Sequence, residues 1–274
     1  MSEITHAKPF LRWAGGKIWL TKYLDNIIGN HTFNGYHEPF LGGASVFFHL
    51  MPKENVFLSD LNEELINTYI AVKQAPNEVI YYMKNYTNDK DAYYEVREKK
   101  PSNSIEAAAR FIYLNQTSFN GIYRVNKKGV YNVPYGYRNK NFIEEDKILT
   151  ASKLLQTVNL YVGDFDNVEN HIKKGDLVFL DPPYTVSHNQ NGFIKYNQKL
   201  FSLEDQFRLK KLIDYIKEVE AYYILTNAAH ETIYNIFYSE RDRFIELNRA
   251  NLIGGEKAQR GQIQEYVFTN IEGA

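Results

Sequence analysis

Short apolar runs that stop near an acidic residue recur along the chain and predict the strands of a buried sheet. Residues 56–58, 160–162 and 177–180 are apolar or aromatic, and an aspartate follows each run within two residues. Runs of this kind are typical of parallel strands that are covered on both faces. Because ligands bind beyond the carboxyl ends of such strands, these acids mark a candidate site. They are Asp60, Asp164 and Asp181.

Apolar positions at helical spacing separate these runs. Residues 20–28 form one such stripe, and another, at 209–216, follows the last of the runs. A third consists of Leu61, Leu65, Tyr69 and Val72. Further strands are expected near residues 36–38, 222–226, 244–247 and 265–269. Strands that alternate with helices predict an α/β fold built on a parallel sheet.

The pattern changes between about residues 75 and 158. Residues 76–116 have helical spacing rich in tyrosine, with a helix from about Ser104. Two short β-like segments then flank residues 126–129, which predicts a hairpin. We therefore expect one domain made of residues 1–74 and 159–274, and an inserted, mostly helical domain, residues 75–158, that carries the hairpin.

The run at 177–180 ends in Asp181-Pro182-Pro183-Tyr184. Prolines cannot donate hydrogen bonds to a neighbouring strand, so the strand must stop there. One carboxylate, rigidly held carbonyls and an aromatic ring then leave the sheet, a set of groups that suits a flat, amino-bearing ring. An Asp-Pro turn is also ordinary chain punctuation, so Asp181 taken alone favours a structural role.

Two glycine pairs precede predicted helices. Gly15 and Gly16, just before Lys17, fit either a helix entry or a loop that approaches a ligand. Gly42 and Gly43 follow a predicted strand and have the form of the first strand-to-helix turn of a nucleotide-binding sheet. Neither pair has the full spacing of a phosphate-binding or dinucleotide-binding loop.

Two of the acids keep alternative roles open. Asp60 follows the glycine turn by about 20 residues, the spacing at which an acid binds the two hydroxyls of a ribose. It is also suited to cap the next helix. Asp164 is equally suited to accept a hydrogen bond from an adenine amino group and to cap the segment that follows it.

The predicted hairpin is basic. Residues 115–142 contain no acid. Their cations are Arg124, Lys127, Lys128, Arg138 and Lys140. Such a run is often a solvated face, but a basic, aromatic segment in a chain of net charge −1 is a candidate nucleic-acid contact.

The composition bounds the class of protein. The chain has 274 residues, of which 44% are hydrophobic and 24% charged, as in soluble globular proteins. The absence of cysteine excludes disulfides, thiolate metal sites and cysteine nucleophiles. We expect no metal, no signal peptide and no membrane segment, and a cytoplasmic location.

Four motifs together resemble the Dam-type, or α-group, DNA adenine-N6 methyltransferases. They are Trp-Ala-Gly-Gly-Lys at 13–17, Pro-Phe-Leu-Gly-Gly at 39–43, the block around Asn-Gly-x-x-Arg at 120–124, and Asp-Pro-Pro-Tyr at 181–184. The resemblance covers nearly the whole chain and implies a Rossmann-like, S-adenosylmethionine-dependent methyltransferase sheet with an inserted target-recognition domain.

The resemblance also implies roles for individual residues. Those expected to contact S-adenosylmethionine are Trp13, Lys17, Phe40, Gly42, Gly43, Asp60, Asp164 and Asp181. Those expected to act on the target base are Asp181, Pro182 and Tyr184. Those expected to contact DNA are Arg12, Asn120, Arg124, Lys127, Tyr137 and Arg138. The family order is Arg-Tyr where this chain has Tyr137-Arg138, which affects the recognised sequence and not the chemistry.

These observations predict a site-specific enzyme that methylates N6 of a flipped-out adenine in double-stranded DNA, at GATC or a related short site. The alternatives are methylation of cytosine N4, RNA adenine or a protein glutamine, and a catalytically silent DNA-binding module. The enzyme is expected to be a monomer. It is either solitary or functionally paired with a restriction endonuclease.

Overall fold

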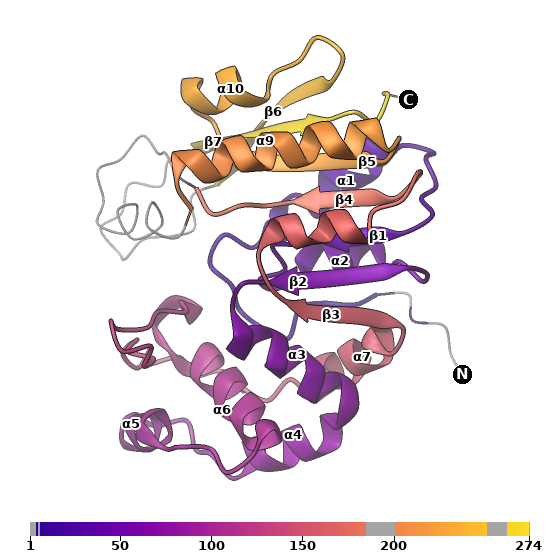
Figure 1. Ribbon diagram of the computed structural model, residues 1–274. Helices are drawn as coiled ribbons and strands as arrows, with labels where there is room; N and C mark the ends of the chain where they lie inside the picture. The colour runs from indigo at the N-terminus through magenta and orange to yellow at the C-terminus, as the bar shows by residue number, and fades with distance from the viewer. Residues whose placement is uncertain (1–3, 5, 185–200, 251–261, 274) are drawn as a thin grey trace. The chain divides into compact units, whose positions relative to one another are not determined.

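The computed structural model describes residue 4 and residues 6–184, 201–250 and 262–273. In these residues seven strands form a mixed sheet in the order β3-β2-β1-β4-β5-β7-β6 (Figure 1). The strands are β1 Tyr36–Glu38, β2 Val56–Asp60, β3 Val158–Val162, β4 Leu177–Leu180, β5 Tyr222–Ala228, β6 Arg243–Ala250 and β7 Gln262–Thr269. The predicted α/β fold is confirmed.

Two compact units divide the chain. One contains residues 1–21 and 41–163, and the other contains residues 22–40 and 164–274. Because this division follows packing and not the change of sequence pattern, the inserted domain at residues 75–158 stays a prediction.

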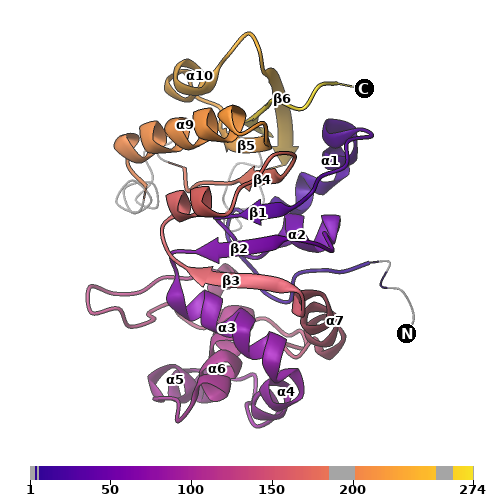
Figure 2. The same ribbon diagram turned by 45° about the vertical axis from the view of Figure 1, so that its right-hand side comes forward.

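The first unit holds the parallel pair β2–β3 and most of the helices. Figure 2 shows α3 to α7 grouped together, with α6 packed against α3, α4 and α5. The helices are η1 Lys17–Trp19, α2 Ser45–Leu50, α3 Glu63–Gln74, α4 Pro76–Lys84, α5 Lys90–Glu98, α6 Ser104–Thr117, η2 Phe119–Gly121 and α7 Glu145–Leu155.

Local sequence explains where these helices begin. The side chains of Asn62, Asp89 and Asn103 accept hydrogen bonds from backbone N–H groups in the first turns of α3, α5 and α6. Pro76 occupies the first turn of α4, where its missing N–H costs nothing. The interior contains the fully buried rings of Tyr93 and Tyr113, so part of the tyrosine in the segment 76–116 fills this core.

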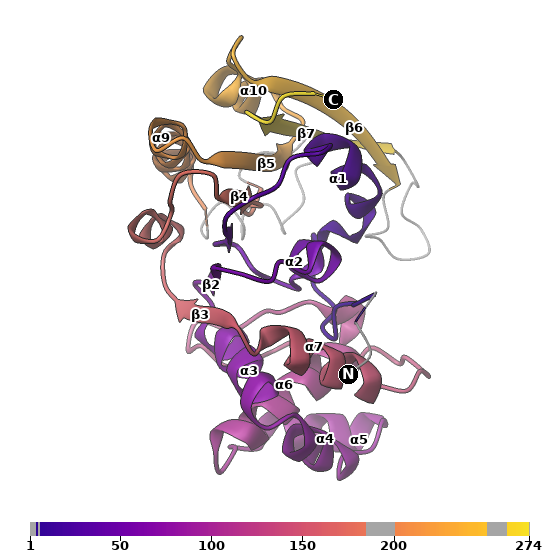
Figure 3. The ribbon, with the colours of Figure 1, turned by 90° about the vertical axis from the view of Figure 1, so that its right-hand side faces the viewer.

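The second unit holds β1, β4 and β5 as parallel neighbours, with β7 antiparallel to both β5 and β6. Figures 1 and 3 show α9 and α1 on opposite faces of these strands. Ser202 and Asp205 form a capping box at the start of α9. The helices are α1 Thr21–Ile28, η3 Phe165–Asn170, α9 Leu203–Glu218 and α10 Glu231–Phe237.

Most of the predicted elements are found, and three details differ. Helix α7 was not predicted. The hairpin has its turn, in which the N–H of Asn126 donates to the carbonyl of Val130, but its arms make only isolated bridges, Val125 to Tyr131 and Ser118 to Tyr135. Strands β6 and β7 extend beyond the expected ranges 244–247 and 265–269, and residues 251–261 between them lie outside the described part.

The structure also bears on membrane association. Among the described residues, none of the helices combines the length and apolar character that crossing a bilayer requires.

Candidate active site

The Asp181 carboxylate stands where β4 ends. All four residues of β4 are buried, and the chain leaves the sheet at Asp181, which is partly exposed. In the parallel register Leu180 lies opposite Leu225 on β5, so the next residue of β5, Thr226, comes beside Asp181. The hydroxyl of Thr226 donates to Oδ1 of Asp181 at 2.9 Å. One oxygen of the carboxylate is therefore held in a fixed direction.

Thr226 is a site residue that the sequence analysis missed. Its side chain is fully buried, and its hydroxyl also lies 3.5 Å from the carbonyl oxygen of Leu180. A polar residue inside the apolar run of β5 was the available signal. Its partner depends on which strand lies next to β5, and a single sequence does not reveal that.

Phe40 lies in an aromatic cluster of the second unit. Its ring stacks on Phe165 with centroids 5.2 Å apart and planes 25° apart, and Phe201 packs against both rings. Phe165 is the residue directly after Asp164. The cluster therefore brings Phe40, from the segment after β1, to the chain exit that carries Asp164.

Asp164 is engaged by an arginine and not by a helix cap. It stands at the N-cap position of η3 but makes no side-chain capping hydrogen bond. Its Oδ1 lies 3.0 Å from a guanidinium nitrogen of Arg208, on α9. Arg208 was not singled out from the sequence, because its helix was judged only by its apolar stripe.

In the first unit the glycine turn packs against Trp13. Gly42 has φ +47°, a left-handed conformation that favours glycine. A Cβ atom at Gly42 would lie 2.7 Å from Cδ1 of the Trp13 indole, and one at Gly43 would lie 3.0 Å from Cβ of Trp13. The close approach that glycine permits here is therefore made by the indole of Trp13. The turn is also tied to α3, because the hydroxyl of buried Tyr69 donates to the carbonyl of Gly42 at 3.0 Å.

Asp60 binds the same turn. Its Oδ2 accepts from the N–H of Gly42 at 3.0 Å, and its Oδ1 accepts from the N–H of Asn62 at 2.9 Å. Asn62, and not Asp60, caps α3, so the capping interpretation of Asp60 is wrong. Burial raises the pKa of Asp60, and the backbone hydrogen bonds from Gly42, Asn62 and Leu61 oppose that rise.

Lys17 is buried near the start of the first helical segment. Only 2% of it is exposed, and its ammonium donates to the carbonyl of Gly15 at 3.2 Å. Its backbone N–H donates to Oγ of Ser45, at the start of α2, at 3.0 Å. The segment that contains Trp13 and Lys17 is thus held against the glycine turn and α2 at two points.

A cavity of about 350 Å³ opens beside Trp13 in the first unit. The predicted site residues that line it are Arg12, Trp13, Gly43, Asn120 and Arg138. Lys127, at the hairpin turn, is exposed and is not among the residues that line the cavity. The structure therefore brings together two residues predicted for the cofactor and three predicted for DNA.

Gln116, at the end of α6, holds both arginines of this cavity. Its backbone carbonyl accepts from Arg12 at 3.2 Å, and its side-chain oxygen accepts from Arg138 at 2.9 Å. Within the described residues, neither guanidinium pairs with a carboxylate. Burial, and after it the charge of Arg138, lowers the pKa of Arg12. Two cations held together in this way favour an anion at the cavity.

Arg124 and Tyr137, unlike Asn120, are not among the residues that line the cavity. Arg124 binds Asn132 across the hairpin, with its Nε 2.8 Å from the side-chain oxygen. Tyr137 is 68% exposed and has φ +52°, and exposed Asn120 has φ +55°. Positive φ is strained for residues other than glycine and is found disproportionately at functional sites.

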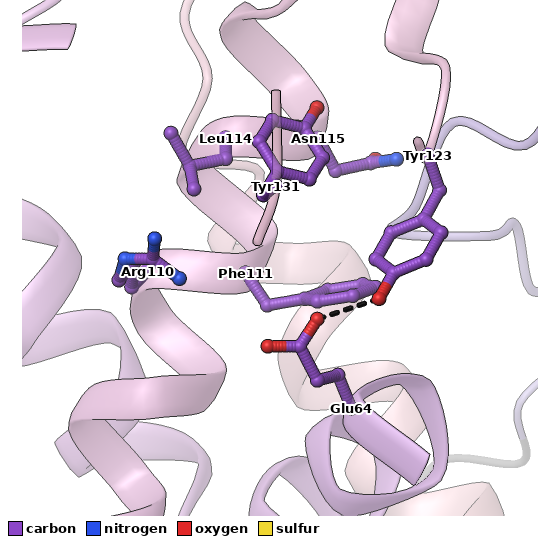
Figure 4. Close-up of a pocket in the computed structure, with 7 residues that line it drawn as sticks. All are labelled: Glu64, Arg110, Phe111, Leu114, Asn115, Tyr123 and Tyr131. Atoms are coloured by element: carbon purple, nitrogen blue, oxygen red, sulfur yellow. Dashed lines mark hydrogen bonds between the residues drawn. The ribbon is translucent and has the colours of Figure 1, made fainter. Parts of the chain in front are cut away.

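A small crevice links α3, α6 and the hairpin (Figure 4). Within it the hydroxyl of Tyr123 donates to Glu64 at 2.7 Å. The ring of Tyr123 stacks on Trp13 with centroids 5.9 Å apart and planes 19° apart. Phe111 stacks on the same indole. Tyr123, the residue before Arg124, is thereby in contact with Trp13, which packs against the glycine turn.

Comparisons with known proteins agree with these motifs. A family model of D12 class N6 adenine-specific DNA methyltransferases matches residues 13–251, which include every candidate site residue except Arg12. A type II methyltransferase of Lactococcus lactis subsp. cremoris is 32% identical over 274 residues, covering 96% of this chain and 95% of that protein.

Two further relatives also cover most of the chain. A type II methyltransferase of Methanocaldococcus jannaschii is 34% identical over 253 residues, or 84% of this chain and 88% of that protein. A DNA adenine methylase of Escherichia coli is 28% identical over 266 residues, or 94% of this chain and 93% of that protein.

Proposed function

The chain belongs to the D12 class of N6 adenine-specific DNA methyltransferases, and on this premise we propose that it transfers a methyl group from S-adenosylmethionine to N6 of an adenine flipped out of double-stranded DNA. The observation that carries the proposal is the Asp181 carboxylate, oriented by Thr226 at the end of β4. The short site it recognises is GATC or a related sequence.

The reaction depends more on the placement of the reacting groups than on strong acids or bases. The lone pair on N6 of adenine is delocalised into the ring and is a poor nucleophile. Asp181 and the carbonyl of Pro182 accept hydrogen bonds from the two N–H groups of the adenine amino group. The N6 nitrogen therefore becomes more tetrahedral, and its lone pair localises. Tyr184 stacks on the base. Fixed acceptors of this kind act mainly by orientation and electrostatic stabilisation.

The side chains of each unit fit S-adenosylmethionine, which supplies the electrophilic methyl group when bound. In the first unit Asp60 has both oxygens fixed by backbone N–H groups and is partly exposed, which suits a ribose diol. Trp13, on the glycine turn, and buried Lys17 complete that half. In the second unit Phe40 stacks with the ring that follows Asp164, and the Asp164 carboxylate suits an adenine amino group.

The DNA contacts follow from charge. Arg12 and Arg138, unpaired with any described carboxylate, suit the phosphate backbone, with Asn120 beside them at the cavity. Arg124 reads a guanine edge, because arginine makes two hydrogen bonds there. Lys127 and Tyr137 add a cation and an exposed ring from the same hairpin. Extrusion of the target base costs a few kcal/mol, which these contacts offset.

The setting of the enzyme is part of the proposal. Relatives named as type II methyltransferases favour functional pairing with a restriction endonuclease. We expect a monomer in the cytoplasm of a prokaryotic or phage-infected cell.

The test compares the wild-type protein with Asp181→Ala. Each is incubated with unmethylated plasmid and S-adenosylmethionine, and the product is sequenced with modification detection. Wild type should leave N6-methyladenine in one short motif, whereas Asp181→Ala should leave none and still bind the donor at least in part. Methylation of cytosine or of RNA in place of DNA adenine, or wild-type turnover by the variant, would refute the proposal.

A further inference from the structure

Arg208 is the centre of an ion-pair network in the second unit. Its guanidinium contacts three carboxylates: Asp164 at 3.0 Å, Asp205 at 2.9 Å and, more closely still, Asp166. Its carbon Cζ also lies 4.7 Å from the ring centroid of Phe165. One side chain on α9 thus contacts three residues of the segment 164–166, which follows β3.

The charges of this network are unequal. Three carboxylates surround one guanidinium, and the hydrogen bonds that Arg208 donates to Asp166 and Asp164 raise its pKa further above the usual range. Without that guanidinium, like charges would repel one another and the segment 164–166 would lose the ion pairs that join it to α9. Asp205 would keep its place, because it also forms the capping box with Ser202.

Packing carries the effect beyond the charges. Phe165 stacks on Phe40 at 5.2 Å and meets Phe201 at 5.6 Å. Arginine has a flat, delocalised face that stacks on an aromatic ring, which a lysine cannot reproduce. A displacement of Arg208 would therefore move both the carboxylate of Asp164 and the ring beside Phe40.

We propose that Arg208 is a positioning residue of the methyl-donor site, which holds Asp164 and Phe165 in place and so determines how strongly the adenine end of S-adenosylmethionine is bound. The inference rests on the proposed function, in which Asp164 accepts from the adenine amino group. Arg208 acts through its neighbours and takes no part in methyl transfer itself.

The test uses Arg208→Gln, with Arg208→Lys as a milder variant and Lys210→Gln as the matched control. Lys210 pairs with Asp214 on the same helix, so its loss removes an α9 ion pair away from the segment 164–166. Calorimetry on the full chain measures binding of S-adenosylmethionine and of its analogue with hypoxanthine in place of adenine. Thermal melts establish that each variant is folded.

We expect Arg208→Gln to bind S-adenosylmethionine about tenfold more weakly, near the lower limit for a hydrogen bond to a charged group, because the side chains of Arg208 and Asp164 are 35% and 42% exposed. In the same variant, the preference for S-adenosylmethionine over the hypoxanthine analogue should also decrease. The donor affinity of Arg208→Lys should lie between those of wild type and Arg208→Gln, and the affinity of the control Lys210→Gln should equal that of wild type. With saturating donor, kcat and the methylated motif should be unchanged.

Three results would overturn the inference: wild-type donor affinity in Arg208→Gln, equal weakening for both donors with the preference intact, or no preference in the wild-type protein. If Arg208→Gln does not fold, wild-type affinity and preference in Arg208→Lys would overturn it equally. A wild-type protein that binds neither donor would instead refute the proposed function.

Discussion

Replacement of Thr226 by valine tests whether the orientation of the Asp181 carboxylate limits catalysis. Valine keeps the shape of the side chain and removes the hydroxyl that donates to Oδ1 of Asp181 at 2.9 Å. A hydrogen bond to a charged group contributes about 1.5–3 kcal/mol, which corresponds to roughly 10- to 150-fold in rate. Asp181 is partly exposed, so water replaces part of the loss and the expected decrease in kcat is about tenfold.

The assay is single-turnover methylation of a duplex with one site at saturating S-adenosylmethionine. The free energy of unfolding should change by less than about 1.5 kcal/mol, because the fully buried position on β5 tolerates a β-branched residue. Thr226→Ser retains the hydroxyl and serves as the control, with a rate close to wild type. Donor affinity, measured by calorimetry, should change little in either variant.

A wild-type rate for Thr226→Val would mean that Asp181 is oriented by other contacts. An equal loss in Thr226→Val and Thr226→Ser would assign the effect to packing and not to the hydrogen bond.

Three other predictions concern the DNA contacts and stability. Arg124→Ala should relax or abolish the choice of site with little change in donor affinity, and an unchanged methylated motif would remove Arg124 from base readout. Gln116→Leu removes the side-chain oxygen that holds Arg138 and keeps the backbone carbonyl that accepts from Arg12, so the KM for DNA should rise about tenfold while donor binding is retained; a KM equal to wild type would show that Arg138 keeps its position without that hydrogen bond. Glu106, whose pKa is lowered to about 2 by Lys99 and Ser102, contributes stability that is present above its unfolded pKa of about 4.3 and is lost as the pH falls toward 2. The free energy of unfolding, measured with urea, should therefore fall less steeply over that pH interval in Glu106→Gln than in wild type. Identical pH profiles for the two proteins would contradict this.

The strands that end near an acid were predictable because several local signals agree. The two prolines after Asp181 stop β4 at Leu180, and β2 begins at Val56, where the predicted run begins, and ends at the acid Asp60. The antiparallel position of β7 between β5 and β6 was not predictable, because it depends on pairing between segments far apart in the chain. Helix α7 was not predictable in the same way, because no side-chain capping hydrogen bond marks its start.

The residues of the candidate site could be predicted more completely than the contacts between them. The glycine turn was expected to leave room for a ligand, yet Gly42 accommodates the indole of Trp13. Thr226 and Gln116 lie in segments assigned to a strand and a helix, and each acts through a partner more than 20 residues away. Only the register of neighbouring strands and the packing of α6 reveal those partners.

The stack of Trp13 on Tyr123 has a thermodynamic consequence for the proposed reaction. In the proposed function Trp13 lies on the donor side, and Tyr123 precedes Arg124, which is proposed to read the base. A ligand that tilts one ring must shift the other, so the two binding equilibria share part of their free energy. Reciprocity then requires that bound donor changes DNA affinity by the same factor by which bound DNA changes donor affinity. Under the proposed function, one pair of rings would thus let the enzyme register whether both substrates are present.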